Sequence, residues 1–255
     1  MTGPTIQSTP VPPGDSSVAP HTHGHSLRRA AYLSAVVGVI YAVLFLVSYW
    51  LVSGQPGPDA SDAELAAFYA SGESRRLILV GLYLMPFAGI AFIWFIVALR
   101  MWISGSSRRE DILLSNVQLV SGILFVALFF AGAAATGASA ASAEFSSAAV
   151  DTGMARQLPA LSNALFFVFA MRMAAMFVFT TSNIGRSTGV LPGWFVLVGF
   201  VVGLFMLLSA TFSPLLVLVF PLWILALSIF LLLRARRIPA DATITDGPPR
   251  QLPLP

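Results

Sequence analysis

One ionisable side chain lies inside a stretch that is long and apolar enough to cross a lipid bilayer. The stretch runs from Leu158 to Thr181, and the charge is Arg172, which we expect to be the only ionisable group at depth. A charged side chain near the bilayer centre is unfavourable by roughly 3 kcal/mol on insertion scales, so it must face protein or water and find a polar partner. Arg172 is therefore the first residue whose chemistry needs an explanation.

Two amides on the preceding apolar run are candidate partners for Arg172. If the chain alternates across the membrane, Arg172 lies about 13 Å from the inner boundary, and Asn116 and Gln118 lie at depths of about 6 to 9 Å. Three roles for Arg172 remain open. It can reach inward to lipid phosphates and to Glu110 or Asp111, hold helices together through the amides, or bind an anionic lipid head group or carboxylate substrate in an inward-facing cavity.

Other residues in the apolar runs favour packing or bending. Asn163 suits an interhelical hydrogen bond, and Gly199 and Gly203 form a GxxxG pair that lets a neighbouring backbone approach closely. Pro86 and Pro221 each remove one helical hydrogen bond and predict kinks. Kinks of this kind serve either as flex points in transporters or as simple packing devices.

Catalytic and metal-binding patterns are scarce. His21, His23 and His25 alternate in HTHGH, and imidazoles at this spacing are at best a weak metal site in a flexible tail. The chain has no cysteine, which excludes disulfides and thiolate chemistry. No nucleophile elbow, zinc-protease motif, phosphate-binding loop or dinucleotide fingerprint occurs. We therefore expect a non-enzymatic protein without a cofactor.

The elements that carry these residues are apolar helices. Of the 255 residues, 57% are hydrophobic and only 10% are charged, which is typical of a membrane protein. Only a helix satisfies its own backbone in lipid when no alternating barrel pattern is present. The predicted fold is therefore an all-α bundle of six transmembrane helices, near Ala30 to Val52, Leu77 to Trp102, Ile112 to Ala135, Leu158 to Thr181, Trp194 to Ala210 and Pro214 to Leu233.

Arginine counting gives the predicted orientation. An even number of spans puts both termini on one side, which then holds ten arginines against three on the other, so both termini should be cytoplasmic in the plasma membrane. The polar segments 1 to 26 and 239 to 255 are predicted to be disordered tails around a membrane domain at 27 to 238. All 14 basic residues are arginines that flank or enter apolar runs, so nucleic-acid binding is not expected.

The first outer loop contains a helix signal. Ser61 is a candidate N-cap, Asp62 and Glu64 suit the positive end of a helix dipole, and Leu65 with Tyr69 lie on one stripe. We expect a short helix along the outer surface. It can serve either as a lid over a cavity or as an interfacial anchor.

The stretch Ala63 to Arg100 (AELAAFYASGESRRLILVGLYLMPFAGIAFIWFIVALR) resembles a group of uncharacterised integral membrane proteins of actinobacteria. The resemblance implies a plasma-membrane location and brings no activity. Membrane lipids are expected partners, together with a protein partner or a second copy of the chain. The leading hypothesis is a non-enzymatic accessory or scaffold subunit of an envelope assembly. The alternative is a transporter of small solutes or lipids that holds an anionic group at Arg172.

Overall fold

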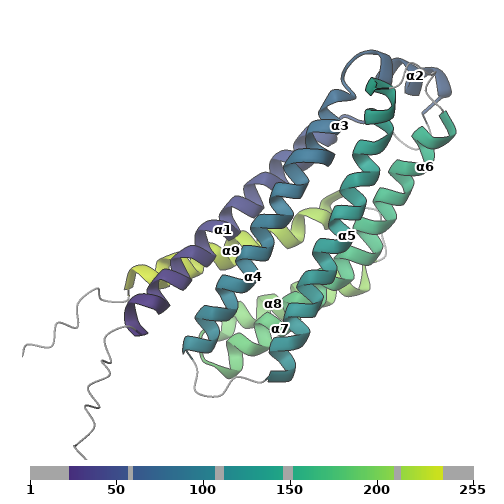
Figure 1. Ribbon diagram of the computed structural model, residues 1–255. Coiled ribbons are helices and arrows are strands. Elements are labelled where there is room, and N and C mark those ends of the chain that lie inside the picture. The colour runs from purple at the N-terminus through teal and green to yellow at the C-terminus, as the bar shows by residue number, and fades with distance from the viewer. Residues whose placement is uncertain (1–22, 57–59, 107–111, 146–151, 210–213, 238–255) are drawn as a thin grey trace, which may run out of the picture.

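The computed structural model describes residues 23–56, 60–106, 112–145, 152–209 and 214–237, and these residues form only helices and their connections (Figure 1). Two of the long helices are interrupted by π-helical segments, named η2 and η3. The elements in chain order are α1 His23–Val52, α2 Asp62–Ala70, α3 Arg75–Leu79, η2 Val80–Leu84, α4 Met85–Ser106, α5 Ile112–Phe145, α6 Thr152–Asn163, η3 Ala164–Ala170, α7 Met171–Ser187, α8 Gly193–Leu208 and α9 Pro214–Arg237.

Five helical stretches are long and apolar enough to cross a membrane. They lie within α1, α3 to α4, α5, α6 to α7, and α9. The helix at the fifth predicted span, Trp194 to Ala210, is α8, which has only 16 residues and falls short of the roughly 20 that a span needs. The prediction of an all-helical protein with membrane-capable helices is thus confirmed for the described residues. The count of six crossings stays a prediction.

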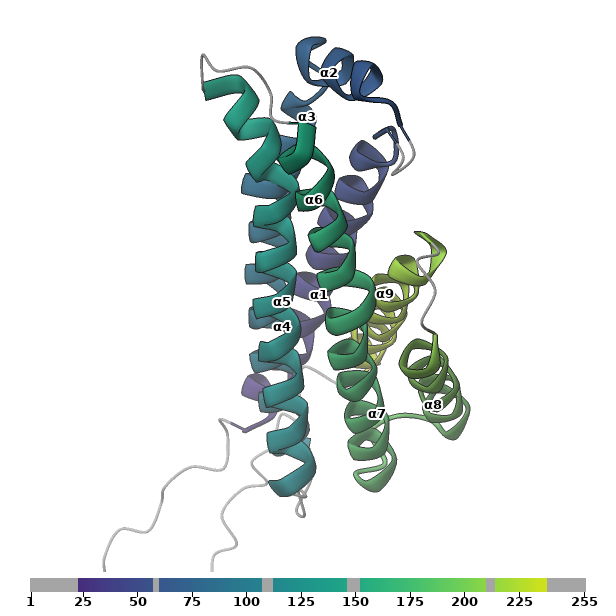
Figure 2. The same ribbon diagram turned by 90° about the vertical axis from the view of Figure 1, so that its right-hand side faces the viewer.

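The long helices alternate in direction and pack side by side. α1 packs on α4 and α9, α5 packs on α4, α6 and α7, and α8 packs mainly on α7. The start of α1 and the end of α9 lie at the same end of the bundle (Figure 1). α8 and the start of α9 stop well short of the opposite end, where α2 lies (Figures 1 and 2). The bundle is therefore thinner at the α2 end.

The short helix predicted after Ser61 is present as α2. The Ser61 hydroxyl accepts from the Glu64 backbone, and the Glu64 carboxylate accepts from the Ser61 backbone at 2.7 Å, which forms a capping box. The Arg156 guanidinium at the start of α6 bonds the Asp62 carboxylate at 2.7 Å. These contacts fix α2 against α6. The structure contains no membrane, so the outer location of α2 stays a prediction.

A second ion pair joins the neighbouring helix ends. Arg75 of α3 pairs with Glu144 at 2.7 Å, near the end of α5. This contact is available because α5 continues to Phe145, ten residues beyond the predicted span end at Ala135. The Arg75 guanidinium donates two hydrogen bonds to one oxygen of the Glu144 carboxylate, and this holds the pKa of Glu144 below its usual range.

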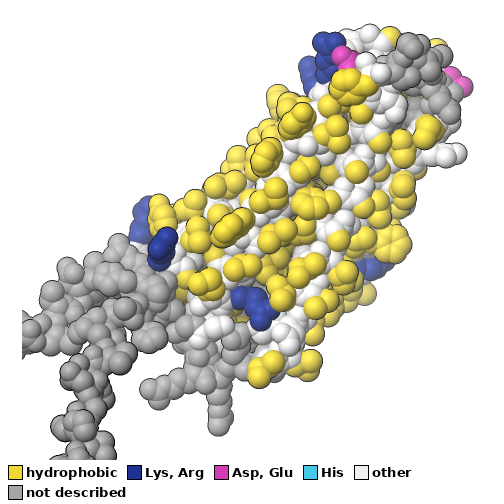
Figure 3. All heavy atoms as spheres, in the orientation of Figure 1, with side chains coloured by type: hydrophobic (Ala, Val, Ile, Leu, Met, Phe, Trp, Pro, Cys, Tyr) yellow, Lys and Arg dark blue, Asp and Glu magenta, His cyan; other side chains and the backbone are white. Residues whose placement is uncertain are grey.

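The surface of the bundle is apolar along its length. Hydrophobic side chains cover the face seen in Figure 3, and acidic side chains appear on that face only at the α2 end. Exposed side chains include large hydrophobic ones such as Trp94 and Met101 of α4 and Val201 of α8. This distribution is what a lipid environment requires. The acidic residues with described side chains are Asp62, Glu64, Glu73 and Glu144.

The predicted tails lie mostly outside the described residues. α1 begins at His23, so its first residues overlap the predicted tail 1 to 26. The C-terminal tail at 239 to 255 falls entirely outside the described residues.

Candidate functional site

Arg172 is half-buried and bonds to its own helix. Its guanidinium donates to the backbone carbonyl of Val168 at 2.6 Å. The acceptor lies in η3, directly before the start of α7. Because a π-helical segment changes the backbone hydrogen-bond register, carbonyls at its edges are accessible to side chains. No carboxylate pairs with Arg172 within the described part of the chain, and Glu110 and Asp111 lie outside it.

The structure does not bring Arg172 together with its two predicted amide partners. Gln118 is buried, and its amide nitrogen donates to the hydroxyl of Thr181 at 2.7 Å, linking α5 to α7. Asn116 is exposed on α5. At about 1.5 Å per residue, Thr181 lies about 20 Å along the helix from Val168. Helical side chains lean toward the N-terminus of their helix, so Arg172 extends away from the amides instead of toward them.

The GxxxG pair faces a neighbouring helix within the same chain. A Cβ atom placed on Gly199 would lie 2.0 Å from the Ser182 hydroxyl, and one on Gly203 would lie 3.1 Å from the Phe179 ring. Both neighbours belong to α7, so these two glycines allow α8 to approach α7 closely.

The prolines occur with π-helical segments in two of the long helices. Pro86 is the second residue of α4 and follows η2 directly, while Pro159 lies inside α6, shortly before η3. A proline ring displaces the carbonyl four residues earlier, which for Pro86 is that of Leu82, and the wider turn of η2 accommodates that displacement. For Pro159 that carbonyl belongs to Ala155 of α6, so η3, which follows the proline, does not relieve it. Pro221 is buried inside α9, which continues through it as one helix.

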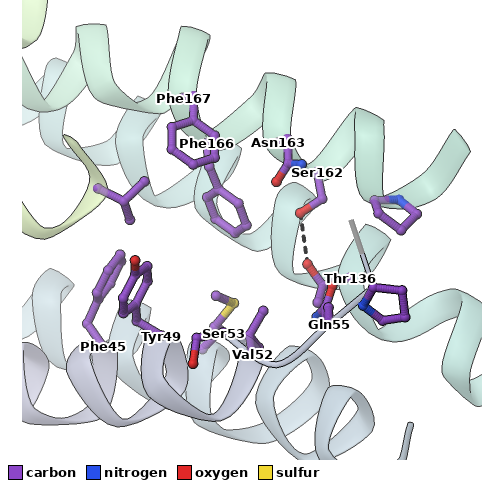
Figure 4. Close-up of a pocket in the computed structure, with 14 residues that line it drawn as sticks. Phe45, Tyr49, Val52, Ser53, Gln55, Thr136, Ser162, Asn163, Phe166 and Phe167 are labelled. Atoms are coloured by element: carbon purple, nitrogen blue, oxygen red, sulfur yellow. Dashed lines mark hydrogen bonds between the residues drawn. The ribbon is translucent and has the colours of Figure 1, made fainter. Parts of the chain in front are cut away.

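A cavity of about 310 Å³ lies between α1 on one side and α6 with η3 on the other. Figure 4 shows the rings of Phe45 and Tyr49 rising from α1 toward Phe166 on the opposite wall. The lining also includes Asn163, whose side chain projects from the end of α6 toward the same space (Figure 4). None of Arg172, Gln118 and Asn116 lines the cavity. The cavity lies toward the α2 end of the bundle, away from the position predicted for an inward-facing site.

Hydroxyl groups form one wall of this cavity. The hydroxyl oxygens of Thr136 and Ser162 lie 2.8 Å apart (Figure 4), and each also lies within hydrogen-bond distance of the Gly132 carbonyl oxygen, at 3.0 and 2.9 Å. Each hydroxyl has one hydrogen, so one of them donates to Gly132 while the other donates either to Gly132 or to its neighbour. These bonds join α5 to α6 across buried polar groups. The amide nitrogen of Gln55, which also belongs to the lining, is buried and has no hydrogen-bond partner among the described residues. A buried donor without a partner is unfavourable unless a ligand or water satisfies it.

Sequence reasoning missed this cavity. Two signals were available in the chain: the fifth apolar run, which forms α8, is short, and Ser162 and Asn163 place two polar groups side by side in an apolar run. Neither signal identifies the opposite wall, because Gln55 and Tyr49 come from a different helix and its following turn.

The predicted histidine metal site stays untested. His23 and His25 belong to the first turn of α1, and His21 lies outside the described residues. Within the described ranges, no cluster of three or more His, Asp or Glu side chains could hold a metal ion. Comparison with known proteins yields no match to a family model, to a curated protein or to a solved structure.

Proposed function

We propose that this chain is a plasma-membrane protein with six crossings and cytoplasmic termini, acting as a non-enzymatic scaffold subunit of an envelope assembly. The observation that carries the scaffold role is a closed aromatic core in the middle of the bundle. Each of the five membrane-capable stretches contributes one ring to it, and all five rings are 0% exposed. The aromatic core consists of Tyr41, Phe92, Phe125, Phe177 and Phe220.

The rings of the aromatic core are in direct contact. The ring centroids of Phe125 and Phe220 are 4.8 Å apart, those of Tyr41 and Phe92 are 4.9 Å apart, and those of Phe92 and Phe177 are 5.3 Å apart. Interiors packed in this way leave few voids larger than a water molecule. A closed centre supports a scaffold better than a carrier, since a carrier needs a polar path near the bilayer midplane.

The scaffold proposal is tested by solute flux. Purified protein in proteoliposomes should release trapped chloride, phosphate or acetate no faster than empty liposomes do. Release above that background would overturn the scaffold role. If flux is found, Arg172→Gln tests the alternative hypothesis of a transporter. Loss of the flux in a variant that still folds would show that the anion pathway depends on Arg172. The matched control is Arg186→Gln, which removes an exposed arginine near the end of the same helix.

The proposed orientation of the first four crossings is tested by labelling single cysteines. The chain has no cysteine of its own, so each introduced thiol is the sole reporter. Ser71, at the end of α2, and Ser187, at the end of α7, are both exposed. An impermeant maleimide added to intact cells should label Ser71→Cys and leave Ser187→Cys unlabelled until the membrane is opened. Labelling of both from outside would contradict the proposed orientation.

A further inference from the structure

The cavity between α1 and η3 has the size of a binding site for a small molecule. Its volume of about 310 Å³ lies at the lower end of the range of about 300 to 1,000 Å³ that ligand pockets occupy. At about 30 Å³ per molecule, that is the volume of about ten water molecules. The proposed scaffold role does not require such a space, and ligand binding in the cavity does not depend on that role.

The lining changes from polar to apolar along the cavity. Gln55, from the turn after α1, and Asn163, at the end of α6, supply amides on the side nearer α2. Phe45, Phe166 and Val217 form the apolar side, and each is less than a tenth exposed. Since Val217 belongs to the first turn of α9, the apolar side lies beside the start of that helix. A membrane leaflet has the same gradient, from polar at its surface to apolar inside.

The cavity lining contains no charged side chain among the described residues. Among the residues that the structure describes, the charged groups nearest along the chain are Arg156, shortly before the lining residue Pro159, and Asp62, and these two form an ion pair with each other. Burying a charge without a partner is strongly unfavourable, so an ionised ligand has nothing to pair with here. The Gln55 amide nitrogen, by contrast, is a buried donor that lacks an acceptor. The lining therefore suits an uncharged molecule with a hydrogen-bond acceptor at one end.

We infer that this cavity binds an uncharged amphiphile taken from the surrounding leaflet, with a hydroxyl- or ester-bearing head at Gln55 and Asn163 and a hydrocarbon chain against Phe45, Phe166 and Val217. Entry from the leaflet is part of this inference, and it is supported by the lack of close packing between the two walls: α1 packs on α4 and α9, whereas α6 packs on α5. The head would accept a hydrogen bond from the Gln55 amide, and the chain would fill apolar space beside the start of α9.

Photolabelling of the full-length protein in lipid nanodiscs tests this assignment. The probe is a monoacylglycerol with a diazirine in its acyl chain, and the comparison probe is the corresponding fatty acid, which carries a charge. The monoacylglycerol should form adducts on α1 and η3, at the level of Phe45 and Phe166, and should label several times more strongly than the fatty acid. Equal labelling by the fatty acid would overturn the assignment of an uncharged ligand.

Two pairs of variants locate the binding. Val217→Phe fills the apolar side and should reduce labelling at least tenfold, whereas Val201→Phe makes the same change on the exposed face of α8 and should leave labelling unchanged. Asn163→Leu removes a polar partner from an exposed position, so folding is retained, and should weaken binding about tenfold. Asn116→Leu, away from the cavity, should have no effect.

Three outcomes would overturn the inference. The first is unchanged labelling in both cavity variants. The second is adducts that are as abundant on the exposed face of α8 as on the cavity walls. The third concerns the source of the ligand: if a short-chain, water-soluble monoacylglycerol binds while the membrane-borne probe does not label, entry from the leaflet is wrong. The flux and topology measurements use different readouts, so their failure is distinguishable from failure here.

Discussion

The centre of the bundle and its α2 end are built from similar residues but packed differently. At the centre, Phe125 is completely buried between rings from neighbouring helices. Toward the α2 end, Phe166 and Phe167 are equally bulky but line a cavity. Both regions are rich in phenylalanine, so residue type does not explain the difference. The number of helices that surround each region does.

Helix length determines that number. α5 has 34 residues and reaches the α2 end, whereas α8 has only 16 and α9 begins near the level where α8 ends (Figure 2). The centre is therefore enclosed by rings from five helical stretches. The α2 end is held by fewer helices, together with the exposed ion pairs of Arg75 and Arg156. Three measurements test whether this difference in packing governs stability.

The largest effect is expected for truncation in the aromatic core. Phe125→Ala should lower the free energy of unfolding by about 3 to 5 kcal/mol, because removal of a buried ring leaves a void that neighbours fill poorly. Phe167→Ala at the cavity should lower it by less than half as much, since that ring is partly buried and already borders empty space. Thermal unfolding in detergent measures both. Equal effects would remove the distinction between the two regions.

An intermediate effect is expected where the second long helix meets α5. A Cβ atom on Gly81 would lie 2.6 Å from the Ala133 carbonyl oxygen and 2.8 Å from the Gly137 nitrogen, which are backbone atoms and cannot rotate away. Gly81→Ala should therefore destabilise the protein by about 1 to 3 kcal/mol. Gly54→Ala is the control, because no atom lies within 4 Å of its added methyl group. If the two variants unfold at the same temperature, the close contact between η2 and α5 contributes little to stability near the α2 end.

The smallest effect is expected from acid at the α2 end. Hydrogen bonds from Arg75 lower the pKa of Glu144, and those from Ser61 lower the pKa of Glu64, relative to a usual value of 4.5. Because the folded-state pKa values lie below 4.5, these contacts stabilise the folded protein fully at pH values above 4.5. The stabilisation is lost as the pH falls through the lower, folded-state pKa. Protection of α2 and α3 amides from hydrogen exchange should then fall, while the aromatic core keeps its protection.

Glu144→Gln should remove part of this acid sensitivity. Glu73→Gln, at an exposed position that forms no ion pair with any described residue, should not. Because both carboxylates are exposed, solvent screening keeps the effect small. Equal acid sensitivity in the wild type and Glu144→Gln would show that the ion pair does not hold this end.

The sequence predicted the long helices well because lipid permits few other structures. Apolar runs predicted all five membrane-capable stretches of the described residues, and Ser61 with Glu64 predicted the start of α2, since capping is a local interaction. The environment of Arg172 was not predictable in the same way. Its acceptor at Val168 depends on a π-helical segment and on the direction of the side chain, which counting residues by depth does not include.

The cavity also depends on distant residues. Gln55 and Asn163 are more than 100 positions apart and meet because α1 and α6 stand side by side without packing closely. Sequence shows each amide separately but not the space between them. The aromatic core has the same origin: its five rings are ordinary apolar positions in five different runs.

The shortness of α8 has a consequence for the lipid around the protein. With 16 residues it is about 24 Å long, against a hydrocarbon thickness of about 30 Å. A bilayer that covers the taller helices would meet a lower apolar wall beside α8, and such a mismatch is relieved by local thinning of the bilayer or by tilt of the helix. The molecule would then perturb the membrane unevenly around its circumference.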